Sequence, residues 1–322
     1  MTRGINTLKT FLALSIIMTV AGCNTTPVPV IAETATPVSS PPDTPTPRPT
    51  STLLPTETAF PSQVPEATNS NNKLNIGLFA GDAAETKKLI DEIGVAPDML
   101  ATFIGLDGSG DIHQEMVDLA KKNKTGLVIY LETNETNSQM LDTETNEWLT
   151  KIAEKLEESE VPTIVVFLPE PNLRGEDIPW ADGTADNSPE KFKKVWAMAH
   201  EIFKDKKNIK LALALNEIQS GDNSTAYIPP ADQVDIYGVD AFRWPDDPRT
   251  TEDMFTSTLD LFAKTGKPMC VFSTATSTDK AKWYQEALDY AKKQKLHCVM
   301  FFNVKKENDW TAPKEILRDA LN

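Results

Sequence analysis

The chain has 322 residues, of which 40% are hydrophobic and 25% charged, ordinary proportions for a globular protein. Its net charge is −15 at pH 7, and its sequence contains no dense cluster of Lys and Arg, which excludes a basic nucleic-acid-binding surface. With only 3 cysteines the chain is not a disulfide-built scaffold, so a hydrophobic core has to stabilise it.

The first 22 residues are typical of a bacterial lipoprotein signal peptide. A basic start precedes an apolar run at 11–18 that is too short to span a bilayer. The leader ends in Val20-Ala-Gly-Cys23, which resembles a lipobox, whose cysteine receives lipid and becomes the new N-terminus. We therefore expect Cys23 to anchor the chain in the membrane, at the extracellular face of the bacterial envelope. The alternative is an ordinary signal peptide that happens to contain a cysteine.

Residues 23–72 form a second, compositionally distinct segment. Roughly half of the chain's 23 prolines lie here, with a similar number of threonines. Proline removes backbone donors and the segment has little apolar surface to bury, so we expect a disordered, semi-extended linker. Its role would be to hold the folded part of the chain away from the membrane.

From residue 73 onwards, short apolar runs alternate with amphipathic stretches of helical period. We expect strands at 74–79, 99–104, 127–131, 163–168, 210–215, 233–239, 268–272 and 297–302. We expect helices at 83–93, 113–122, 147–158, 189–203, 251–264, 278–292 and from 313 onwards. Eight buried strands alternating with helices over about 250 residues predict an α/β fold, one (β/α)8 TIM barrel at 73–322. A doubly wound open sheet is the alternative.

Polar and acidic residues stand where the predicted strands end. In a (β/α)8 barrel the carboxyl ends of all strands meet at one rim, which is where catalytic groups lie. The side chains at these positions are Glu132, Glu170, Glu217, Asp240, Ser273, Asn303 and Asp309. We therefore expect a rim rich in carboxylates.

The segment after the fourth predicted strand is the most informative. It contains Phe167-Leu-Pro-Glu-Pro-Asn172, followed by Ile178-Pro-Trp180. Further along come Phe192 and Trp196, Tyr227-Ile-Pro-Pro, Val234-Asp-Ile-Tyr-Gly238, Lys267-Pro268, Phe301-Phe-Asn303 and Asp309-Trp310. In this order and spacing the motifs resemble glycoside hydrolase family 26, the barrels of β-mannanase type, over nearly all of 73–322.

The resemblance implies roles for several rim residues. Glu170 would be the general acid/base, and its position between Pro169, Pro171 and Trp180 would raise its pKa toward the range for proton donation. Sugar contacts are expected from a wider set: Asn172, Trp180, Phe242, Trp244, Asn303 and Trp310. The partner would be a β-linked polysaccharide or oligosaccharide of the mannan or mixed β-glucan type.

Three positions depart from the family pattern. Ser273 stands about six residues after Lys267-Pro268, where the family has its nucleophilic Glu. Pro169 replaces the usual His before the acid/base, and Phe242 replaces a Tyr. A neutral serine cannot form the usual glycosyl ester without a base of its own.

Two main hypotheses therefore stay open. In the first, the chain is a surface-anchored hydrolase in which Glu217 or Asp240 takes the role of the second carboxylate. In the second, it is a catalytically inactive pseudo-enzyme that binds glycan without cleaving it. A structural surface lipoprotein without a sugar site is the third, plainer interpretation.

The remaining residues indicate no further chemistry. His113, His200 and His297 lack the spacing of a zinc site, and the glycine-containing stretch 105–110 lacks the Lys-Ser/Thr ending of a phosphate loop. We expect no metal, no cofactor and a monomer. Cys270 and Cys298 are expected as two small core residues rather than a disulfide, because neighbouring parallel strands rarely offer the required geometry.

Overall fold

The computed structural model describes residues 73–322 apart from 142, 174–177, 184–185, 219–222 and 307. The predicted signal peptide, Cys23 and the linker up to residue 72 lie outside the described residues. None of the helices in the described part is long and apolar enough to cross a membrane.

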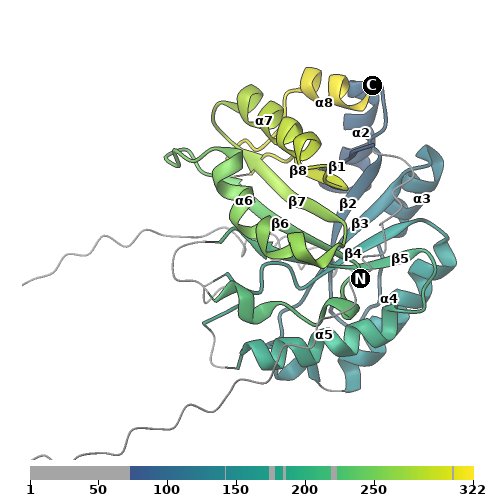
Figure 1. Cartoon of the computed structure of the whole chain (residues 1–322). Coiled ribbons are helices and arrows are strands. Elements are labelled where there is room, and N and C mark those ends of the chain that lie inside the picture. The colour runs from purple at the N-terminus through teal and green to yellow at the C-terminus, as the bar shows by residue number, and fades with distance from the viewer. Residues whose placement is uncertain (1–72, 142, 174–177, 184–185, 219–222, 307) are drawn as a thin grey trace, which may run out of the picture. The chain divides into compact units, whose positions relative to one another are not determined.

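The described chain folds into a closed barrel of parallel strands that follow one another in sequence order (Figure 1). The strands are β1 (Asn75–Phe79), β2 (Met99–Gly105), β3 (Gly126–Glu132), β4 (Thr163–Phe167), β5 (Ile209–Asn216), β6 (Ile236–Arg243), β7 (Met269–Thr276) and β8 (Cys298–Phe302). Closure is made by β1 and β8, which pair from Asn75 opposite Cys298 to Phe79 opposite Phe302. The predicted (β/α)8 TIM barrel is therefore confirmed, and the open sheet is excluded.

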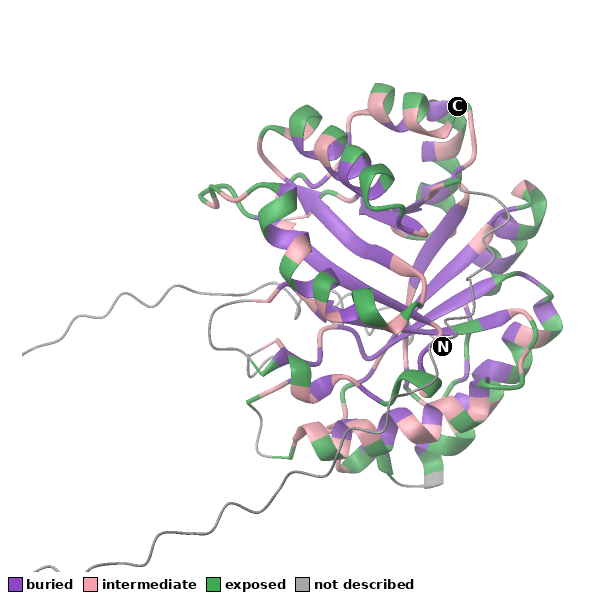
Figure 2. Ribbon diagram, viewed as in Figure 1, coloured by how far each residue is buried: buried purple, intermediate pink, exposed green. Residues whose placement is uncertain are grey.

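The helices lie outside the barrel and cover it (Figure 1). They are α2 (Ala83–Ile93), α3 (Gln114–Asn123), α4 (Thr143–Ser159), α5 (Pro189–Phe203), α6 (Thr251–Phe262), α7 (Lys280–Lys293) and α8 (Lys314–Leu321). Figure 2 shows the strands almost wholly buried, whereas the helices carry buried and exposed residues on opposite sides. The strands lie between the barrel interior and the helices, which explains why their sequences are continuous apolar runs.

Reciprocal side-chain caps mark where two of the helices begin. Asp82 accepts a hydrogen bond from the Glu85 backbone N–H at 2.9 Å, and the Glu85 side chain reaches back to the Asp82 backbone. Thr250 and Asp253 make the same reciprocal pair at the start of α6. These bonds satisfy amide groups that the first helical turn leaves unpaired, and they fix the point at which each preceding loop ends.

Gly238 allows β6 and β7 to approach each other closely. A Cβ at this position would lie 2.6 Å from the backbone oxygen of Cys270 and 2.4 Å from the ring of Phe272, so any larger residue would push β7 away. Just beyond it, the register of the two strands shifts between Val239 and Asp240. The shift places Ser273 opposite Asp240, and irregular pairing of this kind is common next to active sites.

Cys270 of β7 and Cys298 of β8 form a disulfide, so the prediction of two unlinked core residues was wrong. The two strands pair in register at these residues, and the Cα atoms lie 4.7 Å apart, a separation that a disulfide spans. The bond joins residues 28 positions apart in the sequence, with α7 between them.

The strands that carry the predicted site are longer than expected. β6 runs to Arg243 and β7 to Thr276, so Asp240 and Ser273 lie inside their strands rather than after them. β6 also begins later than predicted, because Ala231–Gln233 forms a short 3-10 turn. The acidic rim is therefore deeper in the barrel than the sequence pattern suggested.

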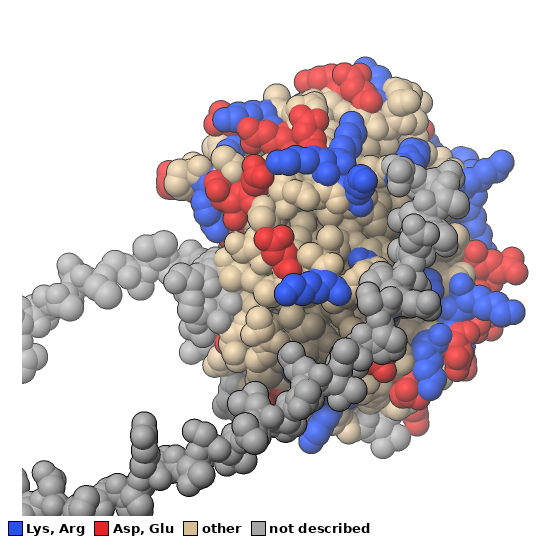
Figure 3. Space-filling view, viewed as in Figure 1, with Lys and Arg blue, Asp and Glu red and all other residues tan. Residues whose placement is uncertain are grey.

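On the face drawn in Figure 3, acidic and basic side chains are interspersed over the helices. Exposed ion pairs include Lys282 with Glu286 on α7 and Lys314 of α8 with Glu92 of α2. Exposed pairs of this kind contribute about 0–1 kcal/mol each, so they add little to the stability of the barrel.

Candidate active site

Glu170 lies in a tight loop directly after β4. Leu168 and Glu170 both adopt positive φ, at 46° and 57°, a left-handed conformation that is uncommon for residues with side chains. The Glu170 N–H donates to the carbonyl of Ala214 in β5, and the Leu173 N–H donates to the carbonyl of Glu170, both at 2.9 Å. Backbone strain of this kind persists where the surroundings hold it, as they do at many functional sites.

Asn216, at the end of β5, donates a hydrogen bond from its side chain to Oε1 of Glu170 at 3.2 Å. Asn172 fixes Asn216 in turn, because it accepts from the Asn216 N–H at 2.9 Å and donates to its carbonyl at 3.1 Å. It also donates to Oγ of Ser224 at 2.8 Å. Asn172 is buried and its amide is engaged within the protein, so it positions Asn216. Its predicted sugar contact stays a prediction.

The surroundings of Glu170 raise its pKa to about 7. Burial is the largest cause, the hydrogen bond from Asn216 opposes it, and the negative charge of Glu217 adds to it. A carboxyl with this pKa holds a proton at slightly acidic to neutral pH and can donate it to a substrate.

Two further carboxyls lie close enough to Glu170 to repel its charge. Burial and the charge of Glu170 raise the pKa of Glu132 to about 8, against the opposing charge of Lys306. Burial, followed by the charges of Glu170 and Glu132, raises the pKa of Asp240 well above its usual range, against a hydrogen bond from the Ser273 backbone. Three carboxyls that repel one another in a buried site retain protons near neutral pH.

Asp240 lies at the floor of the site. It is 3% exposed, and its Oδ1 has no hydrogen-bond partner within the described part of the chain. Ser273, at the position where the family resemblance places a nucleophilic Glu, stands opposite Asp240 in the strand register and is also buried. At this point β7 therefore contributes a neutral hydroxyl instead of a carboxylate.

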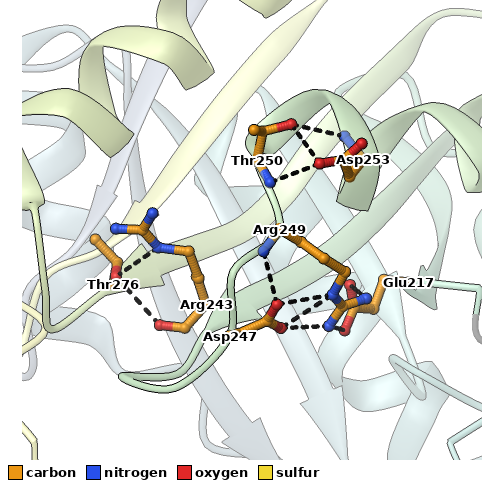
Figure 4. A network of polar contacts seen from close by, with 7 residues as sticks. All are labelled: Glu217, Arg243, Asp247, Arg249, Thr250, Asp253 and Thr276. Atoms are coloured by element: carbon orange, nitrogen blue, oxygen red, sulfur yellow. Dashed lines mark hydrogen bonds and ion pairs between the residues drawn. The ribbon is translucent and has the colours of Figure 1, made fainter.

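Glu217, directly after β5, is engaged in an ion pair (Figure 4). Arg249 donates from Nη1 to Oε2 and from Nη2 to Oε1, both at 2.8 Å. This bidentate geometry gives a strong ion pair. Asp247 holds the same guanidinium through Nε at 2.9 and 3.0 Å. Because Arg249 binds both of its oxygens, Glu217 is not the available second carboxylate that the sequence suggested.

Three residues predicted to contact sugar are buried and make packing contacts, so their sugar-binding role stays a prediction. Trp180 is 5% exposed and donates from Nε1 to the Pro169 carbonyl at 2.8 Å, which supports the Glu170 loop. Trp310 is 1% exposed. Asn303 is buried, and its Oδ1 accepts from the Ala312 N–H at 2.7 Å, which holds the segment after β8.

Trp244 and Phe242 keep exposed surface. Trp244 is 38% exposed and packs edge-on against Trp310, with ring centres 5.1 Å apart. Phe242 is half-buried and contacts the rings of Trp310 and Phe302 at 5.9 and 5.4 Å. A ring can offer its face to a sugar only where that face is open, so these two remain candidates for sugar contact.

The sequence analysis assigns no role to three side chains of this site. Glu132 is the last residue of β3, and this position at a strand end could have indicated its place in the site. Asn216 carried the same signal as the last residue of β5. Arg249 carried none, because its partner Glu217 lies 32 positions away. Among the described positions, no group of three or more His, Cys, Asp and Glu side chains is placed to hold a metal ion.

Comparisons with known proteins identify the family. A profile of glycosyl hydrolase family 26 matches residues 121–318. No curated protein matches the sequence. Among solved structures, the Bacteroides ovatus β-mannanase BoMan26A has a TM-score of 0.60 at 15% identity, over 78% of this chain and 88% of that one.

Two further solved structures resemble this one. The YdhT protein from Bacillus subtilis has a TM-score of 0.56 at 20% identity, over 77% of this chain and 86% of that one. The GH26 domain of a Prevotella bryantii endo-β-mannanase/endo-β-glucanase has a TM-score of 0.57 at 14% identity, over 78% and 89%. These structures share the fold, and the profile match spans more than half of the sequence. The chain therefore belongs to glycosyl hydrolase family 26.

Proposed function

We propose that this chain is a glycoside hydrolase that acts on β-linked polysaccharide of the mannan or mixed β-glucan type at the mouth of its barrel. The proposal is carried by Glu170, a carboxyl after β4 that Asn216 orients and whose pKa is about 7. Family membership and the activities named for the related mannanases support the substrate class.

Glu170 acts as the general acid. Below a pH of about 7 it carries a proton, which it donates to the glycosidic oxygen as the bond between that oxygen and the sugar carbon breaks. Asn216 and Asn172 keep the carboxyl in place, so that little reorganisation is needed when the substrate arrives.

Asp240 supplies the second carboxyl in an inverting reaction. It is electrostatically coupled to Glu170, and such a pair shares one proton at intermediate pH. In the productive form the proton is on Glu170, and Oδ1 of ionised Asp240 accepts a proton from the water that attacks the sugar. In the free protein, burial and charge repulsion favour the proton on Asp240 and a charge on Glu170. We therefore expect slow turnover.

The proposal is tested by incubating the full-length chain with mannan and with mixed-linkage β-glucan and measuring new reducing ends. We expect cleavage of at least one of them, and its loss in Glu170→Gln. Glu158→Gln, an exposed change on α4, is the matched control and should keep full activity. The absence of new reducing ends with both polysaccharides would rule out hydrolysis of this substrate class.

A second candidate function is glycan binding without cleavage. Two observations favour it: β7 offers Ser273 in place of a carboxylate, and Arg249 binds both oxygens of Glu217. Retardation of the protein in a native gel that contains mannan or β-glucan, with no product formed, would support binding over hydrolysis.

We also propose that the protein is anchored at the extracellular face of the bacterial envelope through lipid on Cys23. The leader and its Val20-Ala-Gly-Cys23 ending support this, and the Cys270–Cys298 disulfide is typical of an oxidising compartment outside the cytosol. Cys23→Ala should abolish incorporation of labelled fatty acid and release the protein from the membrane fraction. Unchanged labelling would rule out this anchor.

A further inference from the structure

β6 and the residue directly after it carry three side chains of interest toward the barrel mouth. Asp240 and Phe242 are spaced by two, so their side chains leave the strand on the same side. Trp244 is the first residue after the strand, and it packs against Trp310 as Phe242 does. Arg243 leaves on the opposite side, where its guanidinium lies 4.9 Å from the ring centre of Trp283 in α7. Trp244 is therefore on the side of the strand that also carries the candidate catalytic carboxyl Asp240.

A continuous row of aromatic rings connects Trp244 to the carboxyls. Successive ring centres lie 5.1 Å apart for Trp244 and Trp310, 5.9 Å for Trp310 and Phe242, and 5.4 Å for Phe242 and Phe302. The row continues through Phe103, 6.4 Å from Phe302, to Tyr130, 4.5 Å from Phe103. The charges of Asp240, Glu170 and Glu132 all act on Tyr130. The row thus runs from the exposed Trp244 to Tyr130, beside the three carboxyls.

The loop that presents Trp244 is fixed at both ends (Figure 4). Before it, Arg243 donates to Oγ1 of Thr276 at 3.3 Å and to the Thr278 carbonyl at 2.7 Å. After it, Arg249 is bound to Glu217 at the end of β5, and the Thr250–Asp253 cap starts α6. A turn bond from the Asp247 N–H to the Trp244 carbonyl, at 3.0 Å, closes the loop itself.

An exposed tryptophan on a fixed loop is suited to stacking. Trp244 and Leu141 are the large apolar side chains that the described residues leave exposed, and Trp244 alone of the two joins the aromatic row. Contact with Trp310 restrains the indole, so little side-chain entropy is lost when a ligand covers its open surface.

We propose that Trp244 is a stacking platform for a pyranose unit of the bound polysaccharide, at a point separated from the scissile bond. The inference rests on the proposed function and names a binding point within that site. Trp244 follows Arg243, the last residue of β6, and four residues of extended chain at about 3.3 Å each carry it roughly 13 Å beyond Asp240. This is longer than one sugar ring, so a chain must extend beyond the cleavage point to reach Trp244, and a disaccharide cannot occupy both positions.

The test measures binding in full-length Glu170→Gln, so that hydrolysis does not consume the ligand. Titration calorimetry is performed with mannobiose, mannohexaose and a mixed-linkage β-glucan hexasaccharide. Trp244→Ala in this background should bind the preferred hexasaccharide about ten-fold more weakly, a change of about 1.4 kcal/mol. The affinity for mannobiose should stay the same, and Trp244→Phe, which keeps a flat ring, should retain most of the affinity.

Asp246→Ala is the matched control, because Asp246 is exposed on the same loop and its side chain lies outside the aromatic row. It should bind like the parent. Equal hexasaccharide affinity in Trp244→Ala and the parent, or an equal loss for mannobiose and hexasaccharide, would overturn the platform while leaving the proposed function intact. Failure of the parent to bind either hexasaccharide would overturn both.

Discussion

Arg249 binds both carboxylate oxygens of Glu217 at 2.8 Å, and the charge of Glu217 is one of the causes that raise the pKa of Glu170. The ion pair therefore does more than connect the loop after β6 to the end of β5. It holds a negative charge beside the candidate general acid and offsets that charge with a guanidinium. Glu170 faces two further carboxyls, Glu132 and Asp240, so its protonation depends on all three neighbours.

Arg249→Gln leaves the charge of Glu217 without its main compensation. We expect the pKa of Glu170 to rise further, so that the alkaline limb of the pH profile of kcat/KM, or the Glu170 carboxyl signal in an NMR titration, moves to higher pH. The free energy of unfolding should fall by about 1–3 kcal/mol, because a largely buried charged group loses a partner. Arg249→Lys keeps the charge and should shift the titration less. A loss of stability with an unmoved titration would contradict the electrostatic role.

Stability should decrease as pH rises from about 5 to about 8. Glu170 and Glu132 have pKa values of about 7 and 8 in the folded chain, above the 4.5 of an unperturbed Glu. Over this interval the folded state binds more protons than the unfolded state, so raising the pH favours unfolding. At about 1.4 kcal/mol per pKa unit, the effect of Glu170 alone is on the order of 3 kcal/mol.

Urea unfolding at pH 5 and pH 8 measures this dependence. Glu170→Gln removes one of the titrating groups, so its stability should vary less with pH than that of the unchanged chain. The exposed change Glu158→Gln should leave the dependence as it was. A stability that rises between pH 5 and pH 8 would show that these carboxyls are not the dominant titrating groups.

Ser273→Glu tests whether the β7 position limits catalysis. If the missing carboxylate is the main obstacle, the variant should release more reducing ends from the polysaccharide than the unchanged chain does. Ser273→Gln is the matched control, since it adds similar volume without a charge and should show no gain. An equal lack of gain in both variants would mean that the surroundings, including Pro169 and Phe242, also limit the reaction.

Reduction of the Cys270–Cys298 disulfide should destabilise the barrel. The bond joins residues 28 positions apart, and closing a loop of this length contributes about 3–4 kcal/mol in the chain-entropy estimate. The paired change Cys270→Ser with Cys298→Ser should lower the urea midpoint, and reductant should then have no further effect. Labelling of both thiols in the unreduced, denatured protein would contradict the disulfide.

The periodicity of the sequence is enough to predict the barrel. Continuous apolar runs such as 163–168, separated by amphipathic stretches, can be buried on both faces only in a parallel sheet covered by helices, so eight of them predicted the closed cylinder. The same pattern placed Glu170 at the end of the fourth strand, because position along the chain determines which residues follow a strand.

Contacts between distant segments determine which rim residues are available. In the sequence, Glu217 and Glu170 both follow a strand and appear equivalent. In the structure, Arg249, 32 positions away, donates hydrogen bonds to both oxygens of Glu217. Trp180 and Trp244 are both loop tryptophans in the sequence, yet packing buries the first and leaves the second 38% exposed. Burial, neighbouring charges and strand register all depend on contacts between distant segments. The local sequence pattern does not encode these contacts. For the same reason, only the pairing of β7 with β8 disclosed the disulfide between Cys270 and Cys298.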